Sequence, residues 1–173
     1  MSEATEQARV WALVDPGWTA TDEVPEPPIE ALVGAWPLAP DGGRGLFQPN
    51  PGYRPSTPDS PLDPVDAVIG AIARDEADAE QLPALLREVT FGVAVDDQGV
   101  VIVRPAPDGV PSALVTTSHG HRDRVAAAGW LTVSLAELAD ALPDQGVDVL
   151  LNPGAPNSLR LLADAVRATA AGG

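Results

Sequence analysis

The chain has 173 residues and a formal net charge of -15; 45% of its residues are hydrophobic and only 4% are aromatic. This length and apolar fraction suit a globular domain with an aliphatic core and exclude a disordered chain. The negative charge argues against nucleic acid and anionic membrane surfaces as partners, and the absence of cysteine excludes disulfides and thiolate metal sites.

No targeting or membrane segment is indicated. Residues 1–7 are polar and acidic, whereas a secretory signal needs a basic start and an apolar run. No apolar stretch approaches the roughly 18–20 residues that span a bilayer. With the absence of cysteine, this predicts a cytoplasmic protein without membrane insertion.

Proline divides the chain into two parts. Twelve of the nineteen prolines precede Val65, and because interior prolines break helices, we expect 1–64 to form a Pro-rich β extension packed on the main domain. Turn residues separate its short apolar runs. The composition of 50–64 does not decide whether this loop is ordered. Strands are predicted over 9–14, 32–38 and 45–48.

The second part, 65–173, alternates helical and strand patterns. This alternation predicts an α+β fold, in which a mixed β-sheet is flanked by helices. Helices are expected over 64–74, 79–88, 122–128, 134–142 and 158–169, and strands over 89–95, 100–104, 111–117, 130–133 and 147–151.

Three local signals support particular elements. Ser134 and Glu137 have the spacing of a capping box at the start of a helix. The turn residues 96–99 lie between two β-branched runs and predict a hairpin. The apolar stripe of the last helix is expected to comprise Leu159, Leu162, Ala163 and Val166.

Both histidines lie in the segment Ser118-His119-Gly120-His121. Two histidines at i and i+2 suit a metal ion, and Ser118 with His119 and an acid can be arranged as a hydrolase triad. Two histidines rarely bind a metal without a third ligand, however, and no Gly-x-Ser-x-Gly motif is present. A polar loop explains the segment more simply, so we predict no catalytic residue, no metal and no cofactor.

Aromatic residues interleaved with prolines in the first part are the candidates for binding a protein partner. Trp18, Trp36, Tyr53 and Arg54 belong to the residue types that dominate interface energies. The alternative is that these rings pack the small first sheet and that Tyr53 is a core anchor. In the second part, Asn152 and Pro153 are predicted to form a structural turn after a buried strand.

Five motifs in order carry a family resemblance: WALVDPGW at Trp11–Trp18, VGAW at Val33–Trp36, NPGYRPS at Asn50–Ser56, DPVDA at Asp63–Ala67 and LLNPGAPNSLRL at Leu150–Leu161. Together they resemble actinobacterial type VII secretion system-associated proteins, which carry an SseB-like domain. The resemblance implies an SseB-like domain over 65–173 and a cytoplasmic accessory protein of a secretion locus. It carries over no catalytic residue.

The sequence therefore predicts a non-enzymatic accessory or adaptor protein associated with type VII secretion. Its expected partner is a protein, either a component or a substrate of the secretion locus. One alternative is an immunity-type inhibitor of a secreted toxin, because acidic charge suits a basic partner. The other is a His-centred hydrolase or metalloprotein.

Overall fold

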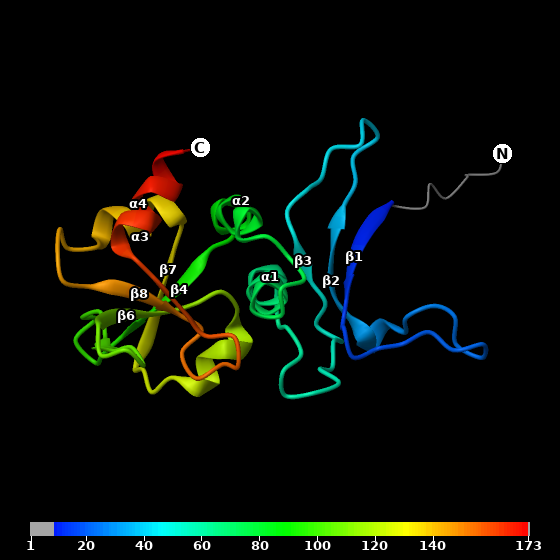
Figure 1. The fold of residues 1–173 in the computed structure, drawn as a ribbon, viewed down its shortest axis with the longest axis horizontal. Coiled ribbons are helices and arrows are strands. Elements are labelled where there is room, and N and C mark those ends of the chain that lie inside the picture. The colour runs from blue at the N-terminus through cyan, green and yellow to red at the C-terminus, as the bar shows by residue number, and fades with distance from the viewer. Residues whose placement is uncertain (1–8, 173) are drawn as a thin grey trace. The chain divides into compact units, whose positions relative to one another are not determined.

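The computed structural model describes residues 9–172. These residues form two compact units, with the boundary between Pro64 and Val65. The first unit contains a three-stranded antiparallel sheet and the second a six-stranded mixed sheet (Figure 1). The α+β class predicted from the sequence is confirmed. Among the described residues, no helix is both long and apolar enough to cross a membrane.

The sheet of the first unit has the strand order β1-β2-β3, with β1 spanning Val10–Val14, β2 Leu32–Pro37 and β3 Gln48–Pro49. A short 3-10 helix, η1 (Ile29–Ala31), leads into β2. The first two strands confirm the prediction. The third is shorter and later than the predicted 45–48, since the pairing with β2 joins Gln48 to Ala35 and Pro49 to Gly34. The ring of Phe47 lies across Gly34, where a Cβ atom would come within 2.3 Å of Phe47 Cζ.

The helices of the second unit lie close to the predicted positions, except those predicted over 122–128 and 158–169. The capping box is confirmed: the backbone N–H of Ser134 donates to Glu137 Oε2 at 2.7 Å, and the N–H of Glu137 donates to Ser134 Oγ at 3.3 Å. The helices are α1 (Pro64–Ala73), η2 (Ala79–Gln81), α2 (Leu82–Glu88), η3 (His119–Arg124), α3 (Leu135–Ala141) and α4 (Ala163–Ala171).

The six-stranded sheet has the order β7-β4-β6-β8-β9, and β5 also pairs with β6. The pair β6–β8 is parallel and all other pairs are antiparallel. The strands are β4 (Phe91–Val95), β5 (Val103–Pro105), β6 (Pro111–Thr116), β7 (Gly129–Val133), β8 (Asp148–Leu151) and β9 (Leu159–Leu161).

Alternating residues of the central strands build a core on each face of this sheet. Phe91, Val93, Val115, Val149 and Leu151 point to the face covered by the helices. Because successive strand side chains point to opposite faces, their neighbours build a smaller core on the second face. This second core comprises Ala94, Ile102, Ala106, Leu114 and Leu150.

The predicted hairpin of 89–95 with 100–104 is wrong in its second strand. The turn forms, with the N–H of Asp96 donating to the carbonyl of Val100 at 2.9 Å. However, β4 already pairs with β7 on one edge and with β6 on the other. The arm after the turn therefore makes a single bridge, Val95 to Val101, and then pairs with β6 as β5.

The predicted helix over 158–169 is also wrong in its first turn. Leu159 and Leu161 pair with Leu151 and Val149 as strand β9, and α4 begins only at Ala163. Of the predicted stripe, Val166 is buried in the core, whereas Leu162 is 54% exposed.

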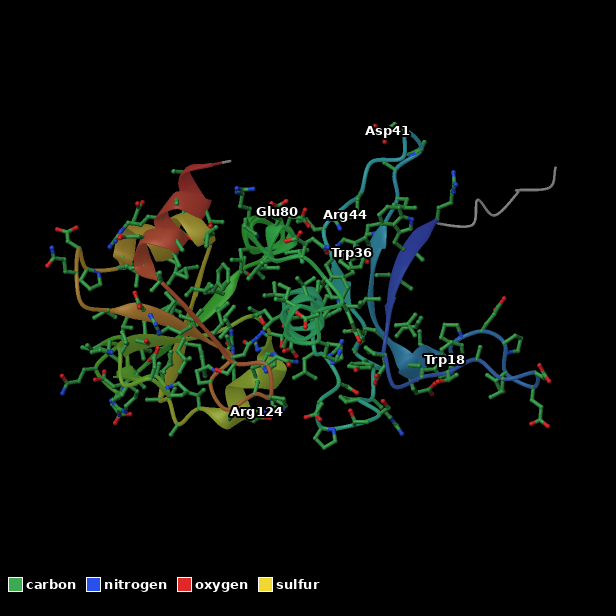
Figure 2. The ribbon with its side chains drawn as sticks, viewed as in Figure 1. Trp18, Trp36, Asp41, Arg44, Glu80 and Arg124 are labelled. Atoms are coloured by element: carbon green, nitrogen blue, oxygen red, sulfur yellow. The ribbon has the colours of Figure 1, made fainter. Side chains whose placement is uncertain are left out.

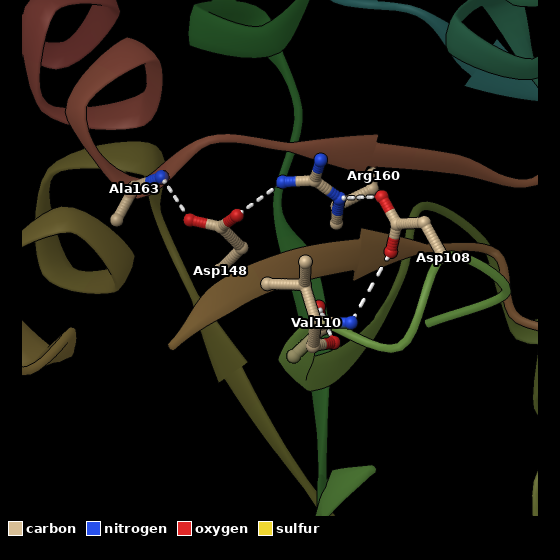
Figure 3. Close-up of polar contacts among 6 residues, drawn as sticks. Asp108, Val110, Asp148, Arg160 and Ala163 are labelled. Carbon is tan, nitrogen blue, oxygen red and sulfur yellow. Dashed lines mark hydrogen bonds and ion pairs between the residues drawn. The ribbon is translucent and has the colours of Figure 1, made fainter. Parts of the chain in front are cut away.

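Figure 3 shows the polar contacts that hold β9 in this position. Arg160 forms ion pairs with Asp148 of β8 and with Asp108, which lies in the turn between β5 and β6. The other carboxylate oxygen of Asp148 accepts a hydrogen bond from the N–H of Ala163 at 2.8 Å, at the start of α4. These long-range contacts outweigh the helical pattern of three local residues.

The helix expected over 122–128 is replaced by η3, which begins and ends earlier. Val125 and Ala127 instead pack against the second core of the sheet. An extended backbone at Val125 allows both side chains to reach it before β7 begins.

Candidate functional site

An apolar hollow lies on the helix-covered face of the six-stranded sheet. Its volume is about 160 Å³, and every residue that lines it is apolar. The sheet contributes Val93, Val103, Ala113, Leu131 and Val133, and α3 with the following loop contributes Leu138, Leu142 and Pro143. A hollow with this lining binds apolar groups and offers no chemistry for bond cleavage.

The hollow exists because α3 is short. Only seven residues long, α3 ends at Ala141, and Pro143 cannot continue it. The edge strand β7 therefore keeps an apolar side chain in solvent: Leu131 is 48% exposed. Val101 and Val103 are exposed beside it.

Acidic residues border this hollow in the sequence and are exposed. Asp140 and Asp144 flank the lining segment of α3 and its loop, and Asp96 and Asp97 occupy the turn before Val101. No acid lines the hollow itself. Asp140 and Asp144 line a separate hollow with Arg167. The apolar lining and the net negative charge of the chain favour a ligand with an apolar group and basic neighbours.

Two of the predicted partner-binding residues are tryptophans in different surroundings of the first unit. The Trp36 ring centroid lies 4.8 Å from that of Phe47, and the guanidinium of Arg44 lies 5.1 Å from the Trp36 ring centroid. Figure 2 shows Trp36 beside Arg44 and Trp18 away from both. Trp18 follows the turn after β1, where its backbone N–H donates to the carbonyl of Asp15 at 3.0 Å. Both rings are half-buried.

The other two predicted residues, Tyr53 and Arg54, differ in their environment. The hydroxyl of Tyr53 donates to Asp15 Oδ2 at 3.1 Å, and Tyr53 is half-buried. Arg54 is exposed, and its backbone N–H donates to the carbonyl of Glu30 at 2.9 Å. Within the described part of the chain, its guanidinium forms no hydrogen bond or ion pair. Only Arg54 of this pair is thus available to a partner.

Asp15 organises this part of the first unit, although the sequence analysis did not single it out. Its side chain is buried, with 1% exposure. Burial by itself raises the pKa of Asp15, but hydrogen bonds from Ser56, Gly17 and Ser60 outweigh this effect and lower the pKa below its ordinary value. The signal was the Asp-Pro-Gly turn, in which an Asp side chain caps the second following N–H.

The two histidines do not converge on a common site. His121 is 1% exposed; its Nδ1 lies 3.1 Å from Arg124 Nη1 and its Nε2 lies 3.4 Å from Asp66 Oδ2. His119 is exposed. Across residues 9–172, no three side chains of His, Asp or Glu are grouped as metal ligands. The arrangement around His121 is that of a packed polar core group.

Asn152 and Pro153 occupy the turn between β8 and β9, and both are buried. Asn152 has a positive φ of 49°, and its Oδ1 accepts a hydrogen bond from the N–H of Thr117 at 2.9 Å. Its own N–H donates to the carbonyl of Val115 at 2.8 Å. Asn152 therefore connects the ends of the parallel strands β6 and β8.

The residues of the apolar hollow were not found by sequence reasoning. Val101, Val103 and Leu131 come from three separate segments, and each alone is an ordinary strand residue. Only the register of β5 and β7 in the sheet brings them together.

Comparisons of this chain with protein-family models, curated proteins and solved structures find no match. The resemblance carried by the five sequence motifs therefore stays a prediction. The function is inferred from the chain's own residues.

Proposed function

We propose that this chain is a non-enzymatic accessory or adaptor protein that acts by binding another protein. The observation that carries the proposal is the apolar hollow between β5, β7 and the end of α3, where Leu131 remains 48% exposed. A concave apolar surface that several elements line together is the usual form of a binding site.

The size of the hollow supports recognition of a single large side chain. Its volume is about 160 Å³, and an apolar cavity of about 150 Å³ holds a benzene ring in another protein. Burying one large apolar side chain contributes about 1.5–3 kcal/mol. An aromatic or aliphatic anchor in a desolvated pocket is the usual centre of a protein interface.

Charge narrows the chemistry of the partner. The chain has a net charge of -15, and Asp140 and Asp144 flank the lining residues 141–143 of the hollow in the sequence. Opposite charges steer association and like charges suppress wrong partners. We therefore propose a partner segment that presents a large apolar side chain next to lysine or arginine.

The biological setting comes from the sequence motifs. Their resemblance supports an SseB-like domain in the second unit and a cytoplasmic role in type VII secretion, with a secretion-locus component or substrate as the partner. An immunity-type inhibitor of a secreted toxin needs the same acidic surface and is the second candidate. The His-centred alternative has little support, since His121 is packed against Arg124 and Asp66.

Partner capture with paired variants tests the proposal. Leu131→Glu places a charge at the hollow, whereas Leu162→Glu places the same charge at a comparably exposed leucine outside it; the two are 48% and 54% exposed. The tagged chain and both variants are expressed in the native cells, and co-purifying proteins are identified by mass spectrometry. A product of the secretion locus is expected with the wild type and Leu162→Glu, and at least tenfold less with Leu131→Glu, about 1.4 kcal/mol.

Two results would count against this proposal in different ways. Equal capture by both variants would remove the hollow from the interface. Capture that depends on Leu131 but yields only a toxin would replace the adaptor role with that of an inhibitor.

A further inference from the structure

A second, polar cavity of about 90 Å³ lies in the Val65–Gly173 unit. Its polar lining consists of Thr90, Thr116, Thr117, Thr132, Ser118, His119 and Arg122. No acidic residue lines it, although the chain contains 25 Asp and Glu residues. The cavity therefore has a cationic side chain and no carboxylate in its lining.

The register of the sheet builds the floor of this cavity. Thr132, Gly92 and Thr116 lie in one row across β7, β4 and β6, because Gly92 pairs with Thr132 on one side and Thr116 on the other. A Cβ atom at Gly92 would lie 2.8 Å from Arg122 Nη2 and 2.9 Å from Thr116 Oγ1. Glycine at this position thus makes room for the guanidinium directly over the strand.

Arg122 is held in place by an aromatic ring, and no acid of residues 9–172 forms an ion pair with it. Its guanidinium lies over the ring of Trp130, 5.0 Å from the centroid, an arrangement that favours a cation. In the part of the chain that the structure describes, Arg122 Nε and Ser118 Oγ are buried without a hydrogen-bond partner. Native proteins satisfy almost all such groups, so unsatisfied donors facing a cavity indicate a bound acceptor.

We propose that this cavity binds a small tetrahedral oxyanion of the phosphate class, through Arg122, Ser118 and the threonine hydroxyls. The guanidinium presents several N–H donors in a planar fork that suits phosphate oxygens. Thr90 and Thr132 also line the cavity, and each carries a hydroxyl that can donate a hydrogen bond to an oxyanion. The volume exceeds that of one water molecule, roughly 30 Å³ in the liquid.

The overall negative charge does not prevent local anion binding. The Debye length is about 8 Å at physiological ionic strength, so exposed carboxylates farther away are largely screened. Arg122 is half-buried, with its Nε fully covered, and such partly buried charges are screened less than exposed ones. This site lies on a different set of residues from the apolar hollow and does not depend on the proposed protein partner.

Titration of the full chain with inorganic phosphate, followed by amide NMR shifts and calorimetry, tests the proposal. Saturable binding is expected, with shifts at Gly92, Ser118 and Arg122. Arg122→Gln is expected to weaken binding at least tenfold, about 1.4 kcal/mol. Arg54→Gln removes an equal charge from an exposed site and is expected to leave binding unchanged.

Arg122→Gln could bind phosphate less well only because it folds poorly. Ser118→Ala is a second test, because it removes a single hydroxyl and disturbs the fold less. We expect it to weaken phosphate binding severalfold while the melting temperature without phosphate is unchanged or raised, since a buried unpaired hydroxyl is lost. A second titration, with methyl phosphate, distinguishes a phosphate monoester from the free ion. Its binding assigns the site to a phosphate monoester group, and its exclusion assigns the site to the free ion.

Three outcomes would overturn the proposal. Phosphate that produces no saturable shift means that water alone fills the cavity. Equal binding by the wild type and Arg122→Gln places the ion elsewhere. Acetate that binds as tightly as phosphate rules out selection for a tetrahedral ion.

Discussion

The hydroxyl of Tyr53 donates a hydrogen bond to Oδ2 of Asp15 at 3.1 Å, joining positions 38 residues apart. The same carboxylate accepts hydrogen bonds from the N–H groups of Gly17 and Ser56, both at 2.8 Å, and from the hydroxyl of Ser60 at 3.0 Å. The composition of the segment around Tyr53 did not decide whether it is ordered. In the structure, hydrogen bonds to one buried acid, Asp15, connect this segment to the turn after β1.

Substitutions at Tyr53 and Arg54 are expected to differ in their effect on stability: Tyr53 has a structural role, whereas Arg54 is available to a partner. Tyr53→Phe removes the hydrogen bond to Asp15 and should lower stability by about 1 kcal/mol, or a few degrees in melting temperature. Arg54→Ala removes an exposed side chain and should leave melting unchanged. Thermal unfolding of each single variant checks both expectations. If Tyr53→Phe melts like the wild type, the hydroxyl contributes nothing, and the residue becomes available as an interface anchor.

Asp15 should also give the first unit a specific acid sensitivity. Its folded pKa lies below the ordinary value, so the stability from this network is fully present above the unfolded pKa of about 3.9. It is lost as the pH falls through the lower folded pKa. Urea unfolding between pH 2 and 7 measures this loss by fluorescence, because Trp11, Trp18 and Trp36 are three of the four tryptophans and all lie in this unit.

Asp15→Asn is the test variant for this acid sensitivity. At neutral pH it should lose about 1–3 kcal/mol, because an amide leaves some of the buried donors unpaired. Below pH 4 the difference from the wild type should shrink. Asp22→Asn, at an exposed position, is the control and should follow the wild type. A constant difference at every pH would assign the effect to packing and not to ionisation.

Local chemistry predicted the elements whose signals are contained within a few residues. The capping box of Ser134 and Glu137 needs only its own spacing, and β8 is a buried run between turns. Strand β9 could not be found this way, since it depends on the pairing of Leu161 with Val149 and on the ion pairs of Arg160. The polar cavity proposed to bind phosphate could not be predicted from local sequence either, because the strand register brings Gly92 beneath Arg122, 30 residues away in the chain.

Asn152 should show two separable contributions to stability. Its positive φ of 49° costs a non-glycine residue about 1 kcal/mol, and its amide satisfies the N–H of Thr117. Asn152→Ala should therefore lose about 2–4 kcal/mol, because the backbone strain remains and the hydrogen bonds vanish. Asn152→Gly relieves the strain and should be less destabilising by about 1 kcal/mol. Urea unfolding gives both values; alanine and glycine variants of equal stability would contradict the backbone contribution.

Replacing each histidine by alanine should affect the stability of the protein differently, and neither histidine is expected to bind a metal. His121 is buried against Arg124 and Asp66, so His121→Ala should cost about 2–4 kcal/mol through a cavity and lost polar contacts. The exposed His119→Ala should be neutral. Elemental analysis after dialysis should find no stoichiometric transition metal. One equivalent of zinc that both variants lose would restore the metalloprotein alternative.

The acids that flank the lining of the apolar hollow in the sequence, Asp140 and Asp144, should control how fast the partner binds. Asp140 and Asp144 are exposed, so they steer a basic partner during encounter without being buried in the complex. Asp140→Asn with Asp144→Asn should slow association roughly two- to fivefold at low salt and leave dissociation nearly unchanged. The salt dependence of association should become shallower, because fewer charges remain to be screened. Stopped-flow or biosensor kinetics with the captured partner measure these rates.

The matched control is Asp22→Asn with Asp59→Asn, which removes the same charge from exposed positions of the first unit. If both double variants slow association equally, net charge alone steers the partner, and Asp140 and Asp144 have no special part in recognition.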